Sequence, residues 1–200
     1  MRIIAGRCRG MRIEVPHGKQ TRPMPDRMRE SLFSSLGSEY GTPGELPDLH
    51  VLDLFAGTGS FGLEALSRGA KLCCFVEKAR SALSTLRQNI ERLGLQGQCW
   101  IINGDAFTCD LPEAPEKQRW QLVFADPPYV MSQVHVDLYS IPNLLTGLSE
   151  SGLLADEALV ILRHPVKTDF DRPVARLRPE RTRTYGTMTF TWFRYESPMT

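Results

Sequence analysis

The chain has 200 residues, a formal net charge of +1 and 42% apolar residues, which predicts one globular domain with room for only a small extension. No apolar run approaches the roughly 18 residues of a membrane-spanning helix, and the basic first ten residues lack the pattern of a signal peptide. The five cysteines have no Cys-x-x-Cys spacing, so we expect a cytoplasmic protein with neither disulfides nor a metal site.

The N-terminal part predicts a small extension. Isoleucines, a methionine and a valine around two glycines favour a β-hairpin within residues 1–20. An extended, proline-containing stretch follows, and Asp26 is an acceptable N-cap for a helix that would run to about Leu36. Residues 37–47 are rich in Gly and Pro and are typical of a linker. We therefore predict an N-terminal extension that ends at residue 47.

The main domain, residues 48–200, alternates predicted strands and helices. Strands are expected at residues 50–55, 71–77, 99–102, 121–125 and 158–163. Helices are expected at residues 60–68, 79–93 and partly 134–148, and Pro142 should disturb the last of these. A turn into a short helix is expected at residues 104–108. This alternation predicts an α/β fold with a mostly parallel, doubly wound sheet. Two β-rich runs, residues 176–184 and 187–195, predict an antiparallel hairpin at the C-terminal end.

The small net charge hides an uneven distribution. Residues 1–30 carry +5, residues 31–162 carry −8 and residues 163–200 carry +4. Two basic ends favour a polyanionic partner, because cations that neutralise phosphates release counterions. Solvated surface charge would explain either end alone, and the two ends together favour nucleic acid.

A glycine loop, Asp53-Leu54-Phe55-Ala56-Gly57-Thr58-Gly59, joins the first strand of the main domain to its first helix. Gly57 and Gly59 would let the backbone approach a ligand closely, and the helix N-terminus behind them favours a carboxylate. Gly62 completes the G-x-G-x-x-G spacing of dinucleotide-binding folds. An NAD-dependent oxidoreductase is therefore one alternative.

Acidic residues follow the next two strands. Glu77 ends the second strand, where an acid can bind both hydroxyls of a ribose. Asp105 follows the third strand and either accepts a hydrogen bond from an adenine amino group, with the Ala106 N–H donating to the ring, or caps a helix. Because the carboxyl ends of parallel strands meet at one edge, we expect these acids to share a rim with Asp53 and Asp126.

Asp126-Pro127-Pro128-Tyr129 follows the fourth strand. The two prolines stop the strand and stiffen the loop behind it. The Asp126 carboxylate and the Pro127 carbonyl could accept hydrogen bonds from the NH2 of a planar ring that stacks on Tyr129. An ordinary strand-ending turn would contain the same residues, so the loop alone leaves both interpretations open.

Several blocks of sequence, taken in order, resemble the RsmD family of bacterial small-subunit rRNA guanine-N2 methyltransferases, which are class I S-adenosylmethionine-dependent enzymes. The blocks are residues 1–10, 22–33, 53–69, 123–129 and 183–187. The resemblance implies a Rossmann-like methyltransferase fold with a seven-stranded, mostly parallel sheet and an antiparallel C-terminal hairpin strand. Met24 stands where that family usually has Thr, which puts a hydroxyl contact near the methionine end of the cofactor in doubt.

The resemblance also implies roles for the loops. S-adenosyl-L-methionine would be bound by Asp53, Phe55, Ala56, Gly57, Thr58, Gly59, Glu77, Asp105, Ala106 and Asp126, and the catalytic loop would be Asp126, Pro127, Pro128 and Tyr129. The target base would be swung out of its stack, with Tyr129 replacing the lost stacking. From the two basic ends we predict RNA phosphate contacts at Arg2, Arg7, Arg9, Arg12, Arg22, Arg29 and Arg183, with Arg178 and Arg181 as further candidates.

The expected substrate is the N2 amine of one guanine in 16S rRNA within an assembling small ribosomal subunit, and we expect a monomeric enzyme. A DNA adenine-N6 or cytosine-N4 methyltransferase shares the Asp-Pro-Pro-Tyr loop but usually brings a larger target-recognition domain. A protein-amide methyltransferase would more often carry Asn at position 126, and an oxidoreductase would need a Tyr-Lys or His constellation that we do not find. A non-catalytic RNA-binding module would have no need for the glycine loop and the four acids.

Overall fold

The computed structural model describes residues 1–15, 24–128 and 140–198. The chain divides into two compact units, Met1–Gly104 and Asp105–Thr200. The expected extension, residues 1–47, lies in the first unit together with the first strands of the expected main domain, and its separation from them stays a prediction.

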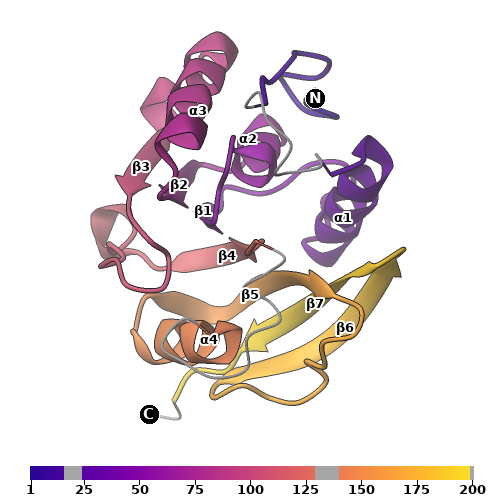
Figure 1. The fold of residues 1–200 in the computed structure, drawn as a ribbon, viewed down its shortest axis with the longest axis vertical. Helices are drawn as coiled ribbons and strands as arrows, with labels where there is room; N and C mark the ends of the chain where they lie inside the picture. Colours follow the sequence, from indigo (N-terminus) through magenta and orange to yellow (C-terminus); the bar gives the residue numbers. More distant parts are fainter. Residues whose placement is uncertain (16–23, 129–139, 199–200) are drawn as a thin grey trace. The chain divides into compact units, whose positions relative to one another are not determined.

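Three parallel strands form the sheet of the first unit (Figure 1). They are β1 (His50–Leu54), β2 (Leu72–Glu77) and β3 (Cys99–Asn103), in the order β3-β2-β1. Every residue of β1 is buried, and so is β2 up to its last residue. Continuous burial of this kind is typical of parallel strands that are covered on both faces. All three predicted strands are confirmed within one residue at each end.

The helices of the first unit are α1 (Asp26–Glu39), α2 (Ser60–Ser67) and α3 (Arg80–Leu93). Helix α2 packs on β1 and β2, and α3 packs on β3. Helix α3 ends at its predicted last residue, Leu93, and Gly94, with a φ of 66°, provides a left-handed cap. The prediction that Asp26 caps α1 is wrong, because Pro25 occupies the N-cap position and Asp26 lies in the first turn, where its carboxylate pairs with Arg29 at 3.1 Å.

The first residues of the chain form a very short hairpin. Arg2 and Arg12 make a single antiparallel bridge, and the Ile3 N–H donates to the Met11 carbonyl at 3.0 Å. Gly6 has a φ of 78°, and a Cβ there would lie 1.8 Å from the Ser67 carbonyl oxygen. The hairpin is therefore pressed against the C-terminal end of α2, and part of the predicted range, residues 16–20, lies outside the described residues.

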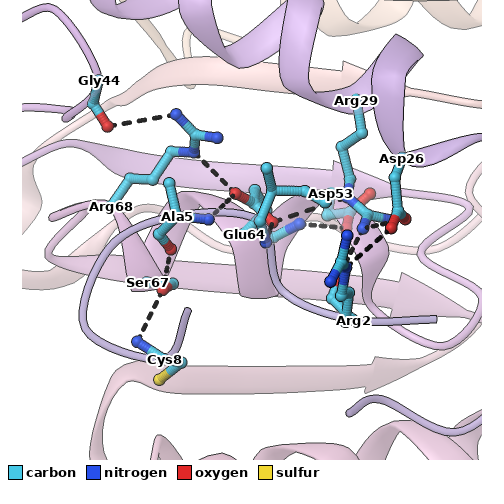
Figure 2. Close-up of polar contacts among 12 residues, drawn as sticks. Arg2, Ala5, Cys8, Asp26, Arg29, Gly44, Asp53, Glu64, Ser67 and Arg68 are labelled. Atoms are coloured by element: carbon cyan, nitrogen blue, oxygen red, sulfur yellow. Dashed lines mark hydrogen bonds and ion pairs between the residues drawn. The ribbon is translucent and has the colours of Figure 1, made fainter. Parts of the chain in front are cut away.

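A buried carboxylate fixes this hairpin to α2, as Figure 2 shows. Glu64 of α2 is 0% exposed and accepts hydrogen bonds from the N–H groups of Ile4 at 2.8 Å and Ala5 at 3.1 Å. Its charge is balanced by Arg68 Nε at 2.8 Å and by Arg29 Nε at 3.6 Å. The hairpin, α1 and α2 thus share one ion network in the interior of the first unit.

In the described residues of the second unit the chain forms four strands, which Figure 1 labels. They are β4 (Trp120–Ala125), β5 (Leu154–Pro165), β6 (Leu177–Tyr185) and β7 (Met188–Tyr195), in the order β4-β5-β7-β6. Strand β4 is parallel to β5, whereas β7 is antiparallel to both of its neighbours. The predicted C-terminal hairpin is confirmed, and β5 begins four residues earlier than predicted.

Helix α4 (Ile141–Glu150) corrects the expectation for Pro142. Pro142 lies in the first turn, where a missing N–H costs nothing, and the Ser140 side chain caps the helix by accepting from the Asn143 N–H at 3.3 Å. Residues 134–139 of the predicted helix lie outside the described residues. Among the helices described, none is long and apolar enough to cross a membrane.

The segment after β3 is also simpler than predicted. The Asp105 carbonyl accepts from the N–H groups of Thr108 at 2.9 Å and Cys109 at 2.8 Å, which makes a single turn instead of the short helix expected at residues 104–108. A short 3-10 helix, η2 (Pro115–Lys117), interrupts the loop that leads to β4.

Candidate active site

The glycine loop of the first unit turns sharply between β1 and α2. Phe55, Gly57 and Gly59 have φ values of 61°, 57° and 87°. Phe55 is unusual in this respect, since non-glycine residues rarely adopt a positive φ, and strain of this kind is concentrated at functional loops. A Cβ at Gly57 would meet no atom within 4 Å, so this glycine is required by its conformation and the space beside it stays open.

Asp53 and Gly62, on either side of the glycine loop, are joined by a hydrogen bond. Asp53 is buried, and its Oδ2 accepts from the Gly62 N–H at 2.9 Å, which ties β1 to the first turns of α2. A Cβ at Gly62 would lie 2.3 Å from Phe75 Cε1 and 2.5 Å from Cys73 Sγ. The third glycine of the G-x-G-x-x-G spacing therefore has a packing role, which is one of the roles it has in dinucleotide-binding folds.

Glu77 meets the glycine loop directly. Its Oε2 accepts from the Gly57 N–H at 2.8 Å, and its Oε1 accepts from the Ala79 N–H at 2.7 Å. Each carboxylate oxygen can accept a second hydrogen bond, so the side chain can still bind a ribose hydroxyl while holding the loop. The structure thus brings together two of the predicted cofactor positions that are 20 residues apart in the sequence.

Asp105 and Ala106 lie at the start of the second unit. Asp105 Oδ1 accepts from the Phe107 N–H at 3.2 Å, and Ala106 is buried. This bond is a local contact within a turn that does not continue into the helix that we considered Asp105 to cap, and the role of Asp105 toward adenine stays a prediction. A hollow of about 470 Å³ lies between this turn and α4, with Phe107 and Asn143 among its lining residues.

Asp126 follows β4 and is paired with an arginine that the sequence did not single out. Arg163 Nη1 lies 3.0 Å from Asp126 Oδ1 and 2.8 Å from Oδ2. The β4–β5 register pairs Ala125 with Leu162 and so places Arg163 beside Asp126. Burial raises the pKa of Asp126, and the charge and hydrogen bond of Arg163 oppose this effect without cancelling it.

The rest of the Asp126 loop is only partly described. Pro127 is buried and Pro128 is exposed, while Tyr129 lies outside the described residues. Asp126 and Asp105 belong to the second unit, and Asp53 and Glu77 belong to the first. The shared rim of the four acids therefore stays a prediction. Within the described part of the chain, no three His, Cys, Asp or Glu side chains are placed together as metal ligands would be.

The predicted RNA-binding arginines differ in their surroundings. Those of the N-terminal hairpin (Arg2, Arg7, Arg9 and Arg12) and Arg183 of β6 are exposed. Arg2 pairs with Asp26, and Arg7 donates to Gln98. Arg29 is a correction: its side chain is 0% exposed and is held by Asp26 and Glu64, so it is not available to a phosphate. Arg22 lies outside the described residues.

The sequence is similar to a protein family and to rRNA methyltransferases of two bacteria. Residues 1–194 match the family described as "Conserved hypothetical protein 95". The chain is 31% identical over 187 residues to the "Putative rRNA methyltransferase YlbH" of Bacillus subtilis, covering 93% of this chain and 94% of that one. It is also 31% identical over 197 residues to the "Ribosomal RNA small subunit methyltransferase D" of Escherichia coli, covering 98% and 91%.

A solved structure agrees along the whole chain. The "Putative methyltransferase yhhF from Escherichia coli" matches with a TM-score of 0.79 at 30% identity, covering 99% of each chain. The protein therefore has the predicted Rossmann-like methyltransferase fold, with seven strands that are mostly parallel and an antiparallel C-terminal hairpin.

Proposed function

The chain belongs to the RsmD family of S-adenosylmethionine-dependent methyltransferases, and we propose that it methylates the exocyclic N2 amine of a guanine in the 16S rRNA of the small ribosomal subunit. The observation that carries the proposal is the likeness, over 98% of the chain, to a ribosomal RNA small subunit methyltransferase. The local geometry of the two loops supports the chemistry, as the next paragraphs describe.

The first unit supplies a suitable cradle for the cofactor. S-adenosylmethionine, when bound, supplies a methyl group made electrophilic by its sulfonium. The glycine loop offers backbone N–H groups at the start of α2 for the carboxylate at the methionine end. Glu77 lies against Gly57 and has lone pairs left for ribose hydroxyls. The methionine end and the ribose of the cofactor can therefore both be held by the first unit.

The Asp126 loop of the second unit fits an exocyclic amine. Such an amine is a poor nucleophile, because its lone pair is conjugated into the ring. Hydrogen bonds from its two N–H groups to the Asp126 carboxylate and the Pro127 carbonyl favour a pyramidal nitrogen, and the carboxylate stabilises the positive charge that builds there. The prolines limit the movement of the loop, so that positioning contributes a large part of the rate.

The exposed arginines of the N-terminal hairpin are our candidates for phosphate contacts. Glu64 and Ser67 fix the backbone beneath them, with the Ser67 hydroxyl accepting from the Cys8 N–H at 3.0 Å (Figure 2). A rigid base lets these long side chains approach a phosphate at a lower entropic cost than a free terminus would. Single-stranded loops are the part of RNA that proteins read most often, and a loop guanine fits this arrangement.

Replacing Asp126 tests the proposal. We expect Asp126→Ala to abolish methyl transfer to small subunits from cells that lack this enzyme, while calorimetry shows S-adenosylmethionine binding retained. Asp156→Ala, at an exposed position of β5, serves as the control and should behave like the unchanged protein. Near-normal turnover by Asp126→Ala would contradict the role of the carboxylate. Transfer to duplex DNA but not to ribosomal subunits would favour the DNA methyltransferase alternative.

A further inference from the structure

The ion pair behind the proposed catalytic loop is assigned no role by the family resemblance. Building on the proposed function, we infer that Arg163 is a positioning residue that keeps Asp126 ionised and turns its carboxylate toward the target amine.

The register of β4 against β5 fixes the position of this ion pair within the second unit. Ala125 of β4 pairs with Leu162 of β5, so the next residue on each strand, Asp126 and Arg163, projects to the same side at neighbouring positions. On its other side Arg163 is paired across the sheet with Phe190 of β7, whose ring is fully buried. The arginine therefore has a carboxylate as its side-chain partner and a buried aromatic residue at the paired position of the next strand.

The geometry of the ion pair leaves the Asp126 carboxylate able to accept hydrogen bonds from the target amine. A guanidinium often binds a carboxylate through two of its nitrogens. Here the single nitrogen Nη1 bridges both oxygens, at 3.0 Å and 2.8 Å. Each carboxylate oxygen has two lone pairs, so one on each oxygen is left for another donor. An amine can therefore donate to Asp126 without displacing Arg163.

The surroundings make the pair stronger than an ordinary surface ion pair. The side chains of Arg163 and Asp126 are 20% and 23% exposed. Nε of Arg163 is buried and has no hydrogen-bond partner among the described residues, so the acceptor that the structure shows for this guanidinium is Asp126. Partial burial lowers the effective dielectric constant, which strengthens the attraction between the two charges.

Arg163 favours the charged form of Asp126 against the effect of burial. Burial favours the neutral acid and raises its pKa, and Arg163, the charged group that acts on it within the described part of the chain, lowers the pKa. A protonated Asp126 would lose its negative charge and one of its accepting oxygens. It would then neither orient the amine nor stabilise the positive charge on the nitrogen.

The test uses two replacements of Arg163 and one control. Arg163→Met should lower kcat at neutral pH, and the acid limb of the pH–rate profile should move upward by about 1–3 pH units, since a nearby opposite charge lowers a carboxyl pKa by that amount. Arg163→Lys restores the charge but not the guanidinium shape, so it should bring the acid limb most of the way back. Arg194→Met removes another arginine of this sheet, one held by Glu157 and Glu180, and should leave the profile unchanged.

Failure of this inference can be distinguished from failure of the proposed function. If the unchanged protein methylates rRNA and Arg163→Met keeps its acid limb, or loses activity equally at every pH, the inference is overturned. The same holds if Arg163→Lys brings no recovery. Should the unchanged protein transfer no methyl group to rRNA, the proposed function fails, and the pair is then tested by unfolding.

Unfolding as a function of pH needs no substrate. Because the pKa of Asp126 is raised in the folded state, folding is most favourable while Asp126 is protonated, and stability declines as pH rises from the unfolded value of 3.8 to the folded pKa. Arg163→Met should extend this decline to higher pH, and Asp126→Asn should remove it in either background. An unchanged pH range in Arg163→Met would overturn the inference. If Arg163→Met does not fold, Arg163→Gln, which keeps a polar head group without the charge, takes its place with the same expected and contradicting results.

Discussion

The fit of α2 on β2 can be tested at Gly62. A Cβ at this position would lie 2.3 Å from Phe75 Cε1 and 2.5 Å from Cys73 Sγ, and both side chains are fully buried on β2. Overpacking of this kind costs about 1–3 kcal/mol, and alanine recovers about 1 kcal/mol through its higher helix propensity. Because the contacts are far inside ordinary van der Waals distance, we take the upper end and expect Gly62→Ala to lower the free energy of unfolding by about 2 kcal/mol.

Gly147 provides the matched control for Gly62. It also lies inside a helix, α4, but it is exposed, and a Cβ there would meet no atom within 4 Å. We therefore expect Gly147→Ala to raise the free energy of unfolding by about 1 kcal/mol, so that the two alanine variants differ by about 3 kcal/mol. Urea denaturation followed by circular dichroism measures both. If Gly62→Ala were as stable as the unchanged protein, the close approach of α2 to β2 would be refuted.

Three further predictions concern charge. Glu64→Gln removes the buried carboxylate that Arg29 and Arg68 share and leaves Arg29 paired with Asp26 alone, so the free energy of unfolding should fall by about 3–5 kcal/mol. Glu91→Gln, at an exposed position of α3, should change it little, and a loss from Glu64→Gln as small as the control's would argue against the network. Replacing the exposed hairpin arginines together by alanine should flatten the salt dependence of RNA binding, by about 0.7 in the log–log slope for each phosphate that is no longer neutralised, and an unchanged slope would remove them from the interface. Burial raises the pKa of Cys99 to about 12, so its alkylation by iodoacetamide should still accelerate between pH 9 and pH 11, and a plateau near pH 9 would contradict this.

The sequence predicted the regular elements well, because their signals are local. Runs of mostly apolar residues marked β1, β2 and β4. The start of α4 was predicted less well, because it depends on a cap that the hydrophobic pattern does not show. Pro142 looked like a disturbance within a helix because the pattern did not show that α4 begins beside it, at a serine cap.

The charged residues were harder to place, because their partners are distant in the sequence. Arg29 stands in a basic stretch that favours a surface position. Its partner Glu64 lies 35 positions further along the chain, and the two side chains form a buried ion pair. Arg163 ends a run of apolar residues and begins the basic C-terminal part of the chain. Only the register of β4 against β5 places it beside Asp126, and no local pattern contains that register.

The loops of the candidate site were found from motifs, but the bond that joins two of them was not. Gly57 and Glu77 were each predicted to bind the cofactor, from loop type and strand position respectively. The structure adds that the carboxylate of Glu77 holds the loop of Gly57 directly, at 2.8 Å. This link depends on the parallel pairing of β1 with β2, which a single sequence does not specify residue by residue.

Nucleoside mass spectrometry tests the central proposal most directly. Small ribosomal subunits from cells that lack this enzyme are incubated with the purified protein and S-adenosylmethionine, and the modified nucleotide is then mapped. We predict N2-methylguanosine at one position of the 16S rRNA with the unchanged protein and none with Asp126→Ala. A methyl group on another base or atom, or equal methylation by Asp126→Ala, would contradict the account.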